Sequence, residues 1–530
     1  MARIAVIGAG MGAMAAAARL AVAGHSVAVY ERAETYGGGV RRFERDGFGF
    51  DTGPGLLHLP AVYRDLFVKT GREPLESCVE LSQVDPAARH VFADGTDLSL
   101  PNASRAGVVA ALDTAFGTGA GERWSELINR ARDVWDATRR PLLEEPLGRD
   151  RRMLGRDPYP TVVKRGLFGR RARAEAGSLA ETALRELRDP RLAALLRSHA
   201  LAYGFDPRTA PASATVLPYV EQTFGTWYVR GGIRALAEAL FERCRARGVE
   251  FHFGAEVADV AFDDKRAIGV ELSDGRRVEA DTVVSGIDAR RLYSERWTPY
   301  NFGPARPWPD EGPLGCGRFT VLLALSGARP ADVPHRTVVH AADPAAELAA
   351  LDGRSGSPCA LPTVTVLRPD DPSLRPDDAH EPVVLTVTVP RHRPAAGTDR
   401  LAGDGHRDWE RDEAGAMDWT AAGLTERYAD QVVAAADAAV PGLAERVMWR
   451  EVRTPVDTER ETGAPGGSLP GPALAGARGE FLRADNRSPL AGLYLAGGSA
   501  HPGGGLAHAG MSGALVAGLI VEGDDWRGSQ

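Results

Sequence analysis

The chain opens on a short apolar stretch, Arg3-Ile4-Ala5-Val6-Ile7, that runs directly into Gly8-Ala9-Gly10-Met11-Gly12-Ala13. The alanine-rich residues 14–23 predict a helix, and Ser26-Val27-Ala28-Val29-Tyr30 predicts a second strand that ends on Glu31. A dinucleotide-binding unit typically shows this order within about thirty residues: a strand, a glycine turn, a helix, a second strand and an acidic residue. The N-terminal end of the chain is therefore predicted to bind a nucleotide cofactor.

Each small residue of the turn has a physical role in such a unit. Gly8 permits the tight turn, Gly10 lets the backbone approach a pyrophosphate, and Ala13 takes the helix-packing position. Gly12 lies at the start of the helix, whose N-terminus offers N–H groups and a partial positive charge to phosphates. Glu31 can hold ribose hydroxyls and disfavours a 2′-phosphate, so NADP is the poorer candidate.

A second glycine cluster, Gly37-Gly38-Gly39-Val40-Arg41, follows the acid, and Asp51-Thr52-Gly53-Pro54-Gly55 comes after it. A glycine pair followed by a basic residue can wrap a second stretch of phosphate, for which NAD enzymes have no need. Residues 37–41 can equally form a flexible loop. This region alone leaves FAD and NAD open.

The C-terminal end of the chain favours FAD. Residues 492–496 predict a buried strand, residues 497–505 form a glycine-rich loop, and residues 506–521 predict a helix of small residues. This is a second strand–loop–helix cradle. One nucleotide site built from both chain ends is how large flavoproteins hold FAD.

With these motifs in view, the chain resembles bacterial FAD-dependent phytoene and carotenoid desaturases, within the amine-oxidase-like flavoprotein superfamily. The resemblance covers nearly the whole chain, and the loop His501-Pro502-Gly503-Gly504-Gly505 is its most specific piece. The motifs that carry it lie at residues 38–41, 46–54, 227–232, 236–240, 283–289, 454–457, 486–487 and 501–505.

The chain departs from the family pattern at two places. Leu506-Ala507-His508-Ala509-Gly510-Met511 stands where the family has apolar residues and proline, and Gly39 and Val40 extend the usual Gly-Gly-Arg form. Both departures lie where the resemblance implies that flavin ring and substrate meet. These departures affect the prediction of the substrate more than the prediction of the cofactor.

The resemblance implies an α/β fold, in which a Rossmann-like FAD-binding domain is interleaved with an α+β substrate-binding domain. Residues 1–75, 226–297 and 486–530 are expected to form the FAD-binding domain. Residues 76–225, which include a membrane-facing part, and residues 298–485 are expected to bind the substrate. A strand at 249–253 and a hairpin about Asp274-Gly275 are predicted inside the second FAD segment.

The motifs and the resemblance together give one set of expected site residues. We expect no metal ligands. The predicted cofactor-binding residues are Gly8, Gly10, Gly12, Ala13, Glu31, Arg32, Gly38, Gly39, Arg41, Gly53, Pro54, Val257, Gly497, Gly498, Gly504, Gly505 and Met511.

Composition narrows the classes of protein and partner. The chain has 530 residues, enough for two or three domains, and its net charge of −8 argues against nucleic acid as a bulk partner. Its 4 cysteines are widely separated, and we interpret them as reduced, buried thiols of a cytoplasmic protein. The apolar stretch 506–521 is too short to span a bilayer, which takes about 20 residues, and no signal peptide is recognised.

Residues 139–173 reverse the acidic character of the chain. Eleven Arg or Lys and four Asp or Glu stand in this stretch, with a few apolar residues among them. Such a segment can lie on an anionic membrane surface, here the inner face of the cell membrane. A solvated basic loop is the alternative. The apolar polyene substrate implied by the resemblance favours the membrane surface.

The resemblance implies desaturation of a carotenoid or related isoprenoid polyene by hydride transfer to flavin N5. Hydride loss leaves a delocalised cation with an acidic neighbouring proton, so a weak base suffices and an apolar tunnel does most of the work. His501, or His508, is the candidate base, and a loop-stabilising role for His501 is equally compatible with its position. Phytoene and hydroxylated carotenoids (3,4-desaturation) are both candidate substrates. Carotenoid cis-trans isomerisation without net redox, and oxidation of another small molecule by FAD, remain as alternatives.

Overall fold

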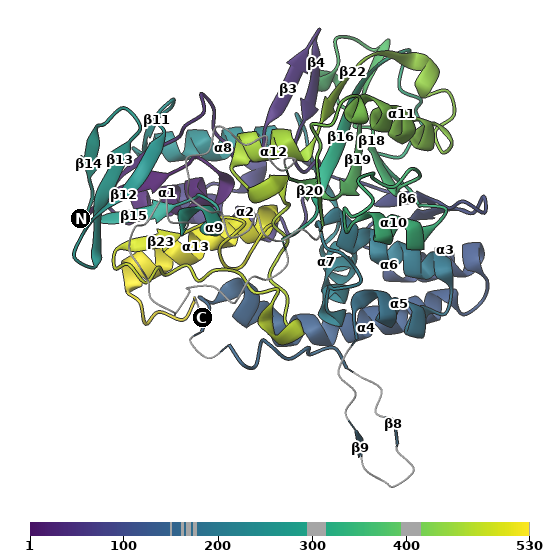
Figure 1. Cartoon of the computed structure of the whole chain (residues 1–530), viewed down its shortest axis with the longest axis horizontal. Coiled ribbons are helices and arrows are strands. Elements are labelled where there is room, and N and C mark those ends of the chain that lie inside the picture. The colour runs from purple at the N-terminus through teal and green to yellow at the C-terminus, as the bar shows by residue number, and fades with distance from the viewer. Residues whose placement is uncertain are drawn as a thin grey trace.

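The computed structural model describes residues 1–148, 151–160, 177–293, 314–393 and 415–528, together with the backbone of β8 (Lys164–Arg165) and β9 (Arg171–Ala172). The elements form two lobes (Figure 1). One lobe is built around a parallel sheet that includes β15 and β23. The other contains the strands around β16 and β19, with a group of helices beneath them.

The parallel sheet combines strands from three distant parts of the chain. Its order is β11-β2-β1-β15-β23, and every neighbouring pair is parallel. Residues from opposite ends of the chain pair directly across it, as Val283 does with Leu493. Because parallel strands end at one edge, the loops after β1, β15 and β23 meet there. The strands are β1 (Arg3–Ile7), β2 (Ser26–Tyr30), β11 (Glu250–His252), β15 (Thr282–Ser285) and β23 (Leu493–Leu495).

Different layers cover the two faces of this sheet. Helices α1 (Met11–Val22), α8 (Ile233–Ala246) and α13 (Leu506–Glu522) contribute to one apolar core, in which Val6 and Val29 of the sheet are buried. The opposite face packs on an antiparallel sheet of β12 (Val257–Asp263), β13 (Arg266–Leu272) and β14 (Arg277–Glu279). Glycine allows α1 and α13 to meet, since a Cβ on Gly513 would lie 2.4 Å from the Gly12 carbonyl oxygen.

The second lobe contains a seven-stranded sheet in the order β22-β16-β19-β18-β17-β6-β7. Its neighbours are antiparallel except β17 and β6. Helix α11 (Leu424–Asp437) packs on one face through Tyr428, and the hairpin of β3 (Arg42–Arg45) and β4 (Phe48–Asp51) covers the other through Phe50. The strands are β22 (Val447–Arg453), β16 (Gly317–Ser326), β19 (His380–Val389), β18 (Val364–Leu367), β17 (Arg336–Val339), β6 (Ala88–Val91) and β7 (Asp97–Leu100).

A group of helices lies beneath this sheet (Figure 1). Its core includes the fully buried Leu112, Leu187 and Leu196, and α5 begins with a capping box in which Ser178 and Glu181 satisfy one another's backbone N–H groups. The helices are α3 (Arg105–Phe116), α4 (Ala120–Arg139), α5 (Leu179–Leu187), α6 (Pro190–Ala202) and α7 (Val216–Phe224).

The remaining elements belong to neither of the two large sheets. They are α2 (Ala61–Gly71), η1 (Leu75–Ser77), β5 (Leu81–Gln83), the π-turn η2 (Arg140–Glu144), η3 (Ala212–Thr215), β10 (Trp227–Val229), α9 (Ala289–Leu292), α10 (Pro344–Ala350), η4 (Pro372–Leu374), β20 (Arg391–His392), β21 (Ala416–Met417), η6 (Ala444–Arg446), α12 (Pro455–Thr462), η7 (Pro465–Gly467) and η8 (Ala477–Gly479).

The predicted α/β fold with a Rossmann-like unit is confirmed. The strands expected at 249–253 and 492–496, the Asp274-Gly275 hairpin and the C-terminal helix are present as β11, β23, β13–β14 and α13. The division into five segments stays a prediction. Of the basic stretch 139–173, only residues 139–148 and 151–160 are described beyond the backbone of β8 and β9. Within the described ranges, no helix is both long and apolar enough to cross a membrane.

Candidate cofactor and active site

A long cavity lies at the edge of the parallel sheet where its strands end. Residues of both lobes line it, from Gly8 after β1 to Thr320 on β16. The predicted cofactor-binding residues, with the exception of Met511, lie along its wall. Met511 instead packs against an apolar cluster that contains Leu59 and Val62.

Three glycine loops converge on the N-terminus of α1. Gly10 precedes the helix and has no side chain to cap it, so the first N–H groups of the helix remain available to a ligand. A Cβ on Gly38 would lie 3.0 Å from the Gly10 Cα, and one on Gly12 would lie 2.8 Å from the Gly497 Cα. Larger residues would push these loops apart, so the glycines keep the backbone close around one anion-binding helix end.

Glu31 is held rigidly beside this turn. Its carboxylate accepts hydrogen bonds from the backbone N–H of Ala9 at 2.7 Å and of Ala33 at 2.9 Å. The side chain is buried, yet it lines the cavity, and its oxygens retain lone pairs that can accept ribose hydroxyls.

Two arginines, Arg41 and Arg32, also line the wall. The Arg41 Nε donates to the Gly38 carbonyl at 2.9 Å, and the Arg32 guanidinium donates to the Arg460 carbonyl at 2.7 Å. Burial lowers the pKa of Arg41, mainly through loss of hydration. A phosphate beside Arg41 would offset this loss, which is what a pyrophosphate-containing cofactor supplies.

The C-terminal cradle is fixed by backbone packing. A Cβ on Gly504 would lie 1.7 Å from the Pro470 carbonyl oxygen, so this position accepts only glycine. The Ser512 hydroxyl accepts from the Gly497 N–H at 3.0 Å and donates to the His501 carbonyl at 2.8 Å. Gly505 then leads into α13, whose positive end faces the cavity through Leu506 and Ala509.

A model of the family described as flavin containing amine oxidoreductase matches residues 14–322. The chain belongs to this family. The glycine loops, the fixed carboxylate and the half-buried Arg41 fit a flavin adenine dinucleotide, and the prediction of FAD is confirmed for this flavin oxidoreductase.

Curated relatives match the flavin oxidoreductase over most of its length. It is 27% identical to a 4,4′-diapolycopene oxygenase of Methylomonas sp, over 98% of each chain. It is 29% identical to the hydroxyneurosporene desaturase of Rubrivivax gelatinosus, over 98% of this chain and 93% of the relative. A zeta-carotene-forming phytoene desaturase of Myxococcus xanthus is 33% identical over 56% of this chain and 55% of its own. The predicted resemblance to carotenoid desaturases is thereby confirmed.

Solved structures show the same fold. Putrescine oxidase bound to putrescine superposes with a TM-score of 0.61 at 16% identity, over 98% of this chain and 99% of the other. An oxidoreductase from Methanosarcina mazei gives a TM-score of 0.61 at 16% identity, over 97% and 99%. At this identity the likeness concerns the fold alone.

His501 does not reach the cavity of the flavin oxidoreductase. Its side chain is fully buried, and its Nε2 lies 2.9 Å from the Glu145 carbonyl oxygen, to which it can only donate. Burial lowers the pKa of His501 to about 4, so the ring is neutral. Asn486 and Ser512 donate to the His501 carbonyl. This placement favours the loop-stabilising role over the predicted catalytic one.

His508 is the better placed of the two histidines. A Cβ on Gly505, which lines the cavity, would lie 3.5 Å from the His508 Nδ1 and 3.5 Å from the Tyr203 Cε1. His508 therefore stands one side chain behind the wall, next to Tyr203, which itself lines the cavity. Burial lowers the pKa of His508 to about 4, which makes it a neutral, weak base.

Sequence reasoning missed the contribution of the second lobe. Arg318 on β16 lines the cavity and donates to the Ala202 carbonyl at 2.7 Å, and burial lowers its pKa. Arg453 also lines it and pairs with Glu461 at 2.5 Å. A lone arginine within the apolar run Gly317–Ser326 was the available signal for Arg318.

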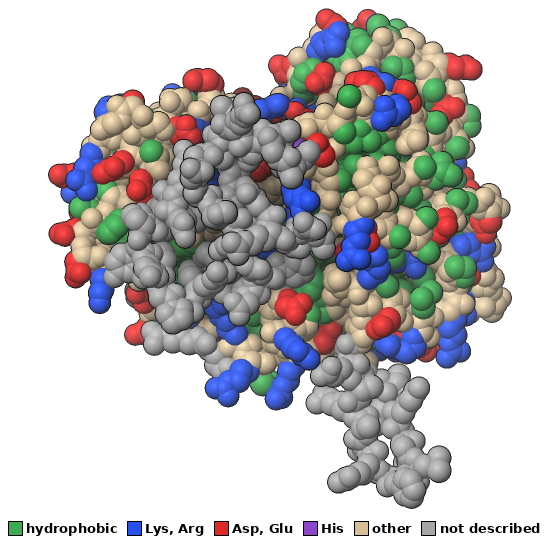
Figure 2. Space-filling view, in the orientation of Figure 1, with side chains coloured by type: hydrophobic (Ala, Val, Ile, Leu, Met, Phe, Trp, Pro, Cys, Tyr) green, Lys and Arg blue, Asp and Glu red, His purple; other side chains and the backbone are tan. Residues whose placement is uncertain are grey.

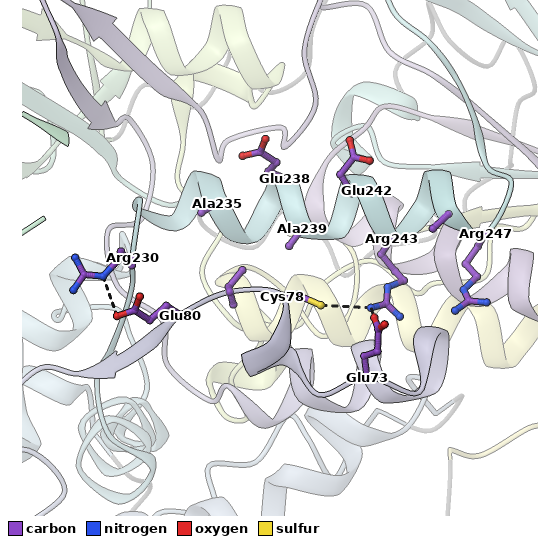
Figure 3. Close-up of a pocket in the computed structure, with 12 residues that line it drawn as sticks. Glu73, Cys78, Glu80, Arg230, Ala235, Glu238, Ala239, Glu242, Arg243 and Arg247 are labelled. Carbon is purple, nitrogen blue, oxygen red and sulfur yellow. Dashed lines mark hydrogen bonds and ion pairs between the residues drawn. The ribbon is translucent and has the colours of Figure 1, made fainter. Parts of the chain in front are cut away.

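A second cavity, of about 670 Å³, runs along the outer side of α8 (Figure 3). Two ion pairs lie in this groove: Arg243 pairs with Glu73 at 2.6 Å, and Arg230 pairs with Glu80 at 2.9 Å. Cys78 lies beside Arg243, with the thiol sulfur 3.5 Å from the guanidinium (Figure 3). Cys78 is exposed, so the prediction of buried cysteines is wrong for this residue. None of the predicted site residues lines this groove, which plays no part in the cofactor site.

Proposed function

We propose that the chain is an FAD-dependent desaturase of a carotenoid or a related long apolar isoprenoid polyene. The observation that carries the proposal is the wall around the N-terminus of α13, where Tyr203, Leu469, Pro470 and Leu506 present largely apolar surface. This surface suits a polyene better than an ammonium-bearing amine, which binds most readily beside carboxylates or aromatic cages. Two relatives matched end to end carry carotenoid-modifying names, which supports the same substrate class.

When bound, FAD would supply the hydride acceptor. The glycine loops and Arg41 would hold the cofactor, and the apolar wall would align the substrate and exclude water. We assign His508 as the group that takes the released proton at its Nδ1, because its neutral ring lies directly behind Gly505. A weak base is adequate, since the proton leaves a carbon next to a delocalised cation.

The direct test is anaerobic mixing of the FAD-loaded protein with liposomes that carry a panel of acyclic carotenoids. Flavin bleaching together with a product lighter by two hydrogens is the expected result. An unchanged product mass would show an isomerase instead. Hydrogen peroxide formed from a small polar amine, without carotenoid turnover, would show an oxidase.

A second candidate is oxygenation of a carotenoid end group, favoured by the full-length match to the 4,4′-diapolycopene oxygenase. The same reaction mixture, exposed to air, separates the two activities by product mass. Desaturation removes two hydrogens, whereas oxygenation adds oxygen to the terminal carbon.

We also propose that residues 139–173 hold the protein on an anionic membrane surface, from which an apolar substrate can be extracted. Support comes from the eleven basic residues of this stretch in an acidic chain. Figure 2 shows charges of both signs interspersed over one face, with several basic side chains along its lower rim. Co-sedimentation with phosphatidylglycerol vesicles at low salt, lost at high salt, is expected. Equal sedimentation with neutral vesicles would contradict an electrostatic contact.

A further inference from the structure

Arg318 places a positive charge on the wall of the cofactor cavity without a counter-charge from the described part of the chain. Its side chain is half-buried, and its guanidinium donates to the Ala202 carbonyl at 2.7 Å. Loss of hydration is what lowers its pKa, and no acid acts against this shift. Arg453, on the neighbouring strand β22, differs because it pairs with Glu461 at 2.5 Å. An unpaired charge that has lost hydration is costly, so Arg318 calls for an anionic partner.

The register of β16 directs this side chain into the cavity. Phe319 is buried on the side of the sheet that α11 covers, so Arg318 and Thr320 lie on the opposite face. Farther along the strand, Leu322 on that face is covered by the β3–β4 hairpin. Nearer the start of the strand, the same face lines the cavity through Thr320 and Arg318. Arg318 is therefore part of the cavity wall.

The parallel sheet gives the order in which the parts of FAD would lie along the cavity. Glu31 follows β2 and suits the ribose of the adenosine, and the α1 N-terminus after Gly10 suits the pyrophosphate. Gly497 follows β23, and a Cβ on Gly12 would lie 2.8 Å from its Cα. Since β2 and β23 lie on opposite sides of β1, Glu31 and Gly497 flank the pyrophosphate position from opposite sides. The flavin half of FAD would thus lie on the Gly497 side.

Arg318 lies at this flavin side of the cavity. The loop that begins at Gly497 ends at Gly505, where a Cβ would lie 3.5 Å from the Tyr203 Cε1. Tyr203 follows Ala202, whose carbonyl accepts from Arg318. The unpaired guanidinium is therefore close to the part of the wall expected to face the flavin ring, and not to the part expected to face the phosphates.

The neighbouring groups do not balance this charge. Burial raises the pKa of the Tyr203 hydroxyl and lowers the pKa of His508 to about 4, so both side chains are neutral at pH 7. The N-terminus of α13, which begins after Gly505, adds a partial positive charge. This end of the cavity is thus electropositive and suits a group that becomes anionic.

We propose that Arg318 stabilises the negative charge that the flavin ring acquires when it accepts a hydride. In that step a C–H bond of the donor breaks, its electron pair and proton form an N–H bond at N5, and the neutral ring becomes an anion with its charge on the N1–C2=O side. The oxidised ring offers Arg318 no such charge, so the guanidinium favours the reduced cofactor. The inference rests on FAD and not on the proposed substrate.

The test measures the midpoint potential of bound FAD, by photoreduction with a reference dye and without any substrate. Arg318→Gln removes the charge but can still donate to the Ala202 carbonyl, whereas Arg318→Lys keeps the charge. We expect Arg318→Gln to weaken the preference for reduced over oxidised FAD about tenfold or more, which lowers the potential by about 30 mV per tenfold. Arg318→Lys is expected to keep most of the wild-type potential.

Arg450→Met is the matched control. Arg450 lies on β22 of the same sheet, but it pairs with Glu426 at 2.7 Å and with Asp430 at 2.5 Å on α11, on the face away from the cavity. Its loss is expected to leave the potential unchanged. FAD content and the melting temperature Tm show whether each variant is folded, and Arg318→Met takes the place of Arg318→Gln if the latter is not.

The outcomes separate this inference from the desaturase proposal. An unchanged potential in Arg318→Gln, or an equal fall in Arg450→Met, would overturn the role of Arg318 and leave desaturation intact. Weaker binding of oxidised and reduced FAD alike, at an unchanged potential, would also overturn it and would place a phosphate beside Arg318. A lowered potential in a protein that turns over no carotenoid would leave the inference standing without the desaturase proposal.

Discussion

Asp51 caps a helix that begins 182 residues later in the chain: its carboxylate accepts the backbone N–H of Ile233 at 2.6 Å. The next N–H, of Arg234, donates to the same carboxylate at 3.2 Å. Asp51 ends β4 and is followed by Gly53 and Pro54 of the cavity wall, whereas Ile233 starts α8 under the parallel sheet. The cap therefore links the wall of the cofactor site to helix α8, which packs against the parallel sheet.

This cap should give stability an unusual dependence on pH. Burial raises the pKa of Asp51 to about 6, although the two N–H donors and nearby arginines oppose the shift. An acid whose pKa is higher in the folded state stabilises the fold fully below its unfolded value of about 4, and this contribution is lost as pH rises through 6. Relative to Asp51→Asn, the wild type should lose on the order of 2–3 kcal/mol between pH 4 and pH 7.

Thermal melts of both proteins at pH 4.5, 5.5, 6.5 and 7.5 measure this difference. The wild-type Tm minus the Asp51→Asn Tm should become steadily less favourable as pH rises. A difference that stays flat would show that the carboxylate ionises at its ordinary pKa, and one that grows more favourable with pH would show a pKa lowered by folding; either result contradicts the prediction.

Gly504 should be intolerant of even one methyl group. A Cβ there would lie 1.7 Å from the Pro470 carbonyl oxygen, so Gly504→Ala must displace one of two packed backbones. We expect FAD affinity to fall at least tenfold and Tm to drop by several degrees. Gly148→Ala is the matched control, because nothing lies within 4 Å of a Cβ at Gly148. Fluorescence titration of the apoproteins with FAD gives the affinities, and equal values for the two variants would contradict the packing argument.

Much of the cofactor site could be predicted because its signals are local. The turn after β1, the acid after β2 and the loop before α13 each combine a glycine pattern with an adjacent strand or helix, and these patterns follow from backbone geometry. Tyr203 and Arg318 carry no such signal. Each is a single residue on an element of the other lobe, and only tertiary packing brings it to the wall.

The two histidines of the C-terminal cradle show the same limit on a smaller scale. His501 and His508 flank one glycine loop, and their positions in the sequence do not say which ring faces the cavity. The contact between His501 and the Glu145 carbonyl, on a distant turn, shows that the His501 ring does not face the cavity. Long-range contacts of this kind leave no periodicity in the sequence.

Arg41 should contribute a large part of FAD affinity. Its guanidinium is held on the cavity wall by the Gly38 and Glu461 carbonyls and has lost hydration, so a phosphate is a strong partner. Arg41→Ala should weaken FAD binding about tenfold to a hundredfold, and Arg41→Lys should weaken it less. Arg19→Ala, which breaks a surface pair with Asp65, should leave the affinity unchanged. Titration of the apoproteins at two salt concentrations checks this, and an unaltered Kd in Arg41→Ala would place the phosphates elsewhere.

His508 and His501 should respond in opposite ways to the same substitution. His508→Gln should retain FAD and lower kcat about tenfold to a hundredfold, because the group that accepts the proton is weakened. His501→Gln should change kcat little but lower Tm, because the bond to the Glu145 carbonyl is disturbed, at a cost of about 1–3 kcal/mol.

In the wild type, kcat should fall as pH drops toward 4, since burial lowers the pKa of His508 to about 4 and the protonated ring cannot accept a further proton. This acid limb should be absent from His508→Gln. A larger loss of kcat in His501→Gln than in His508→Gln, at equal FAD content, would return the role of base to His501.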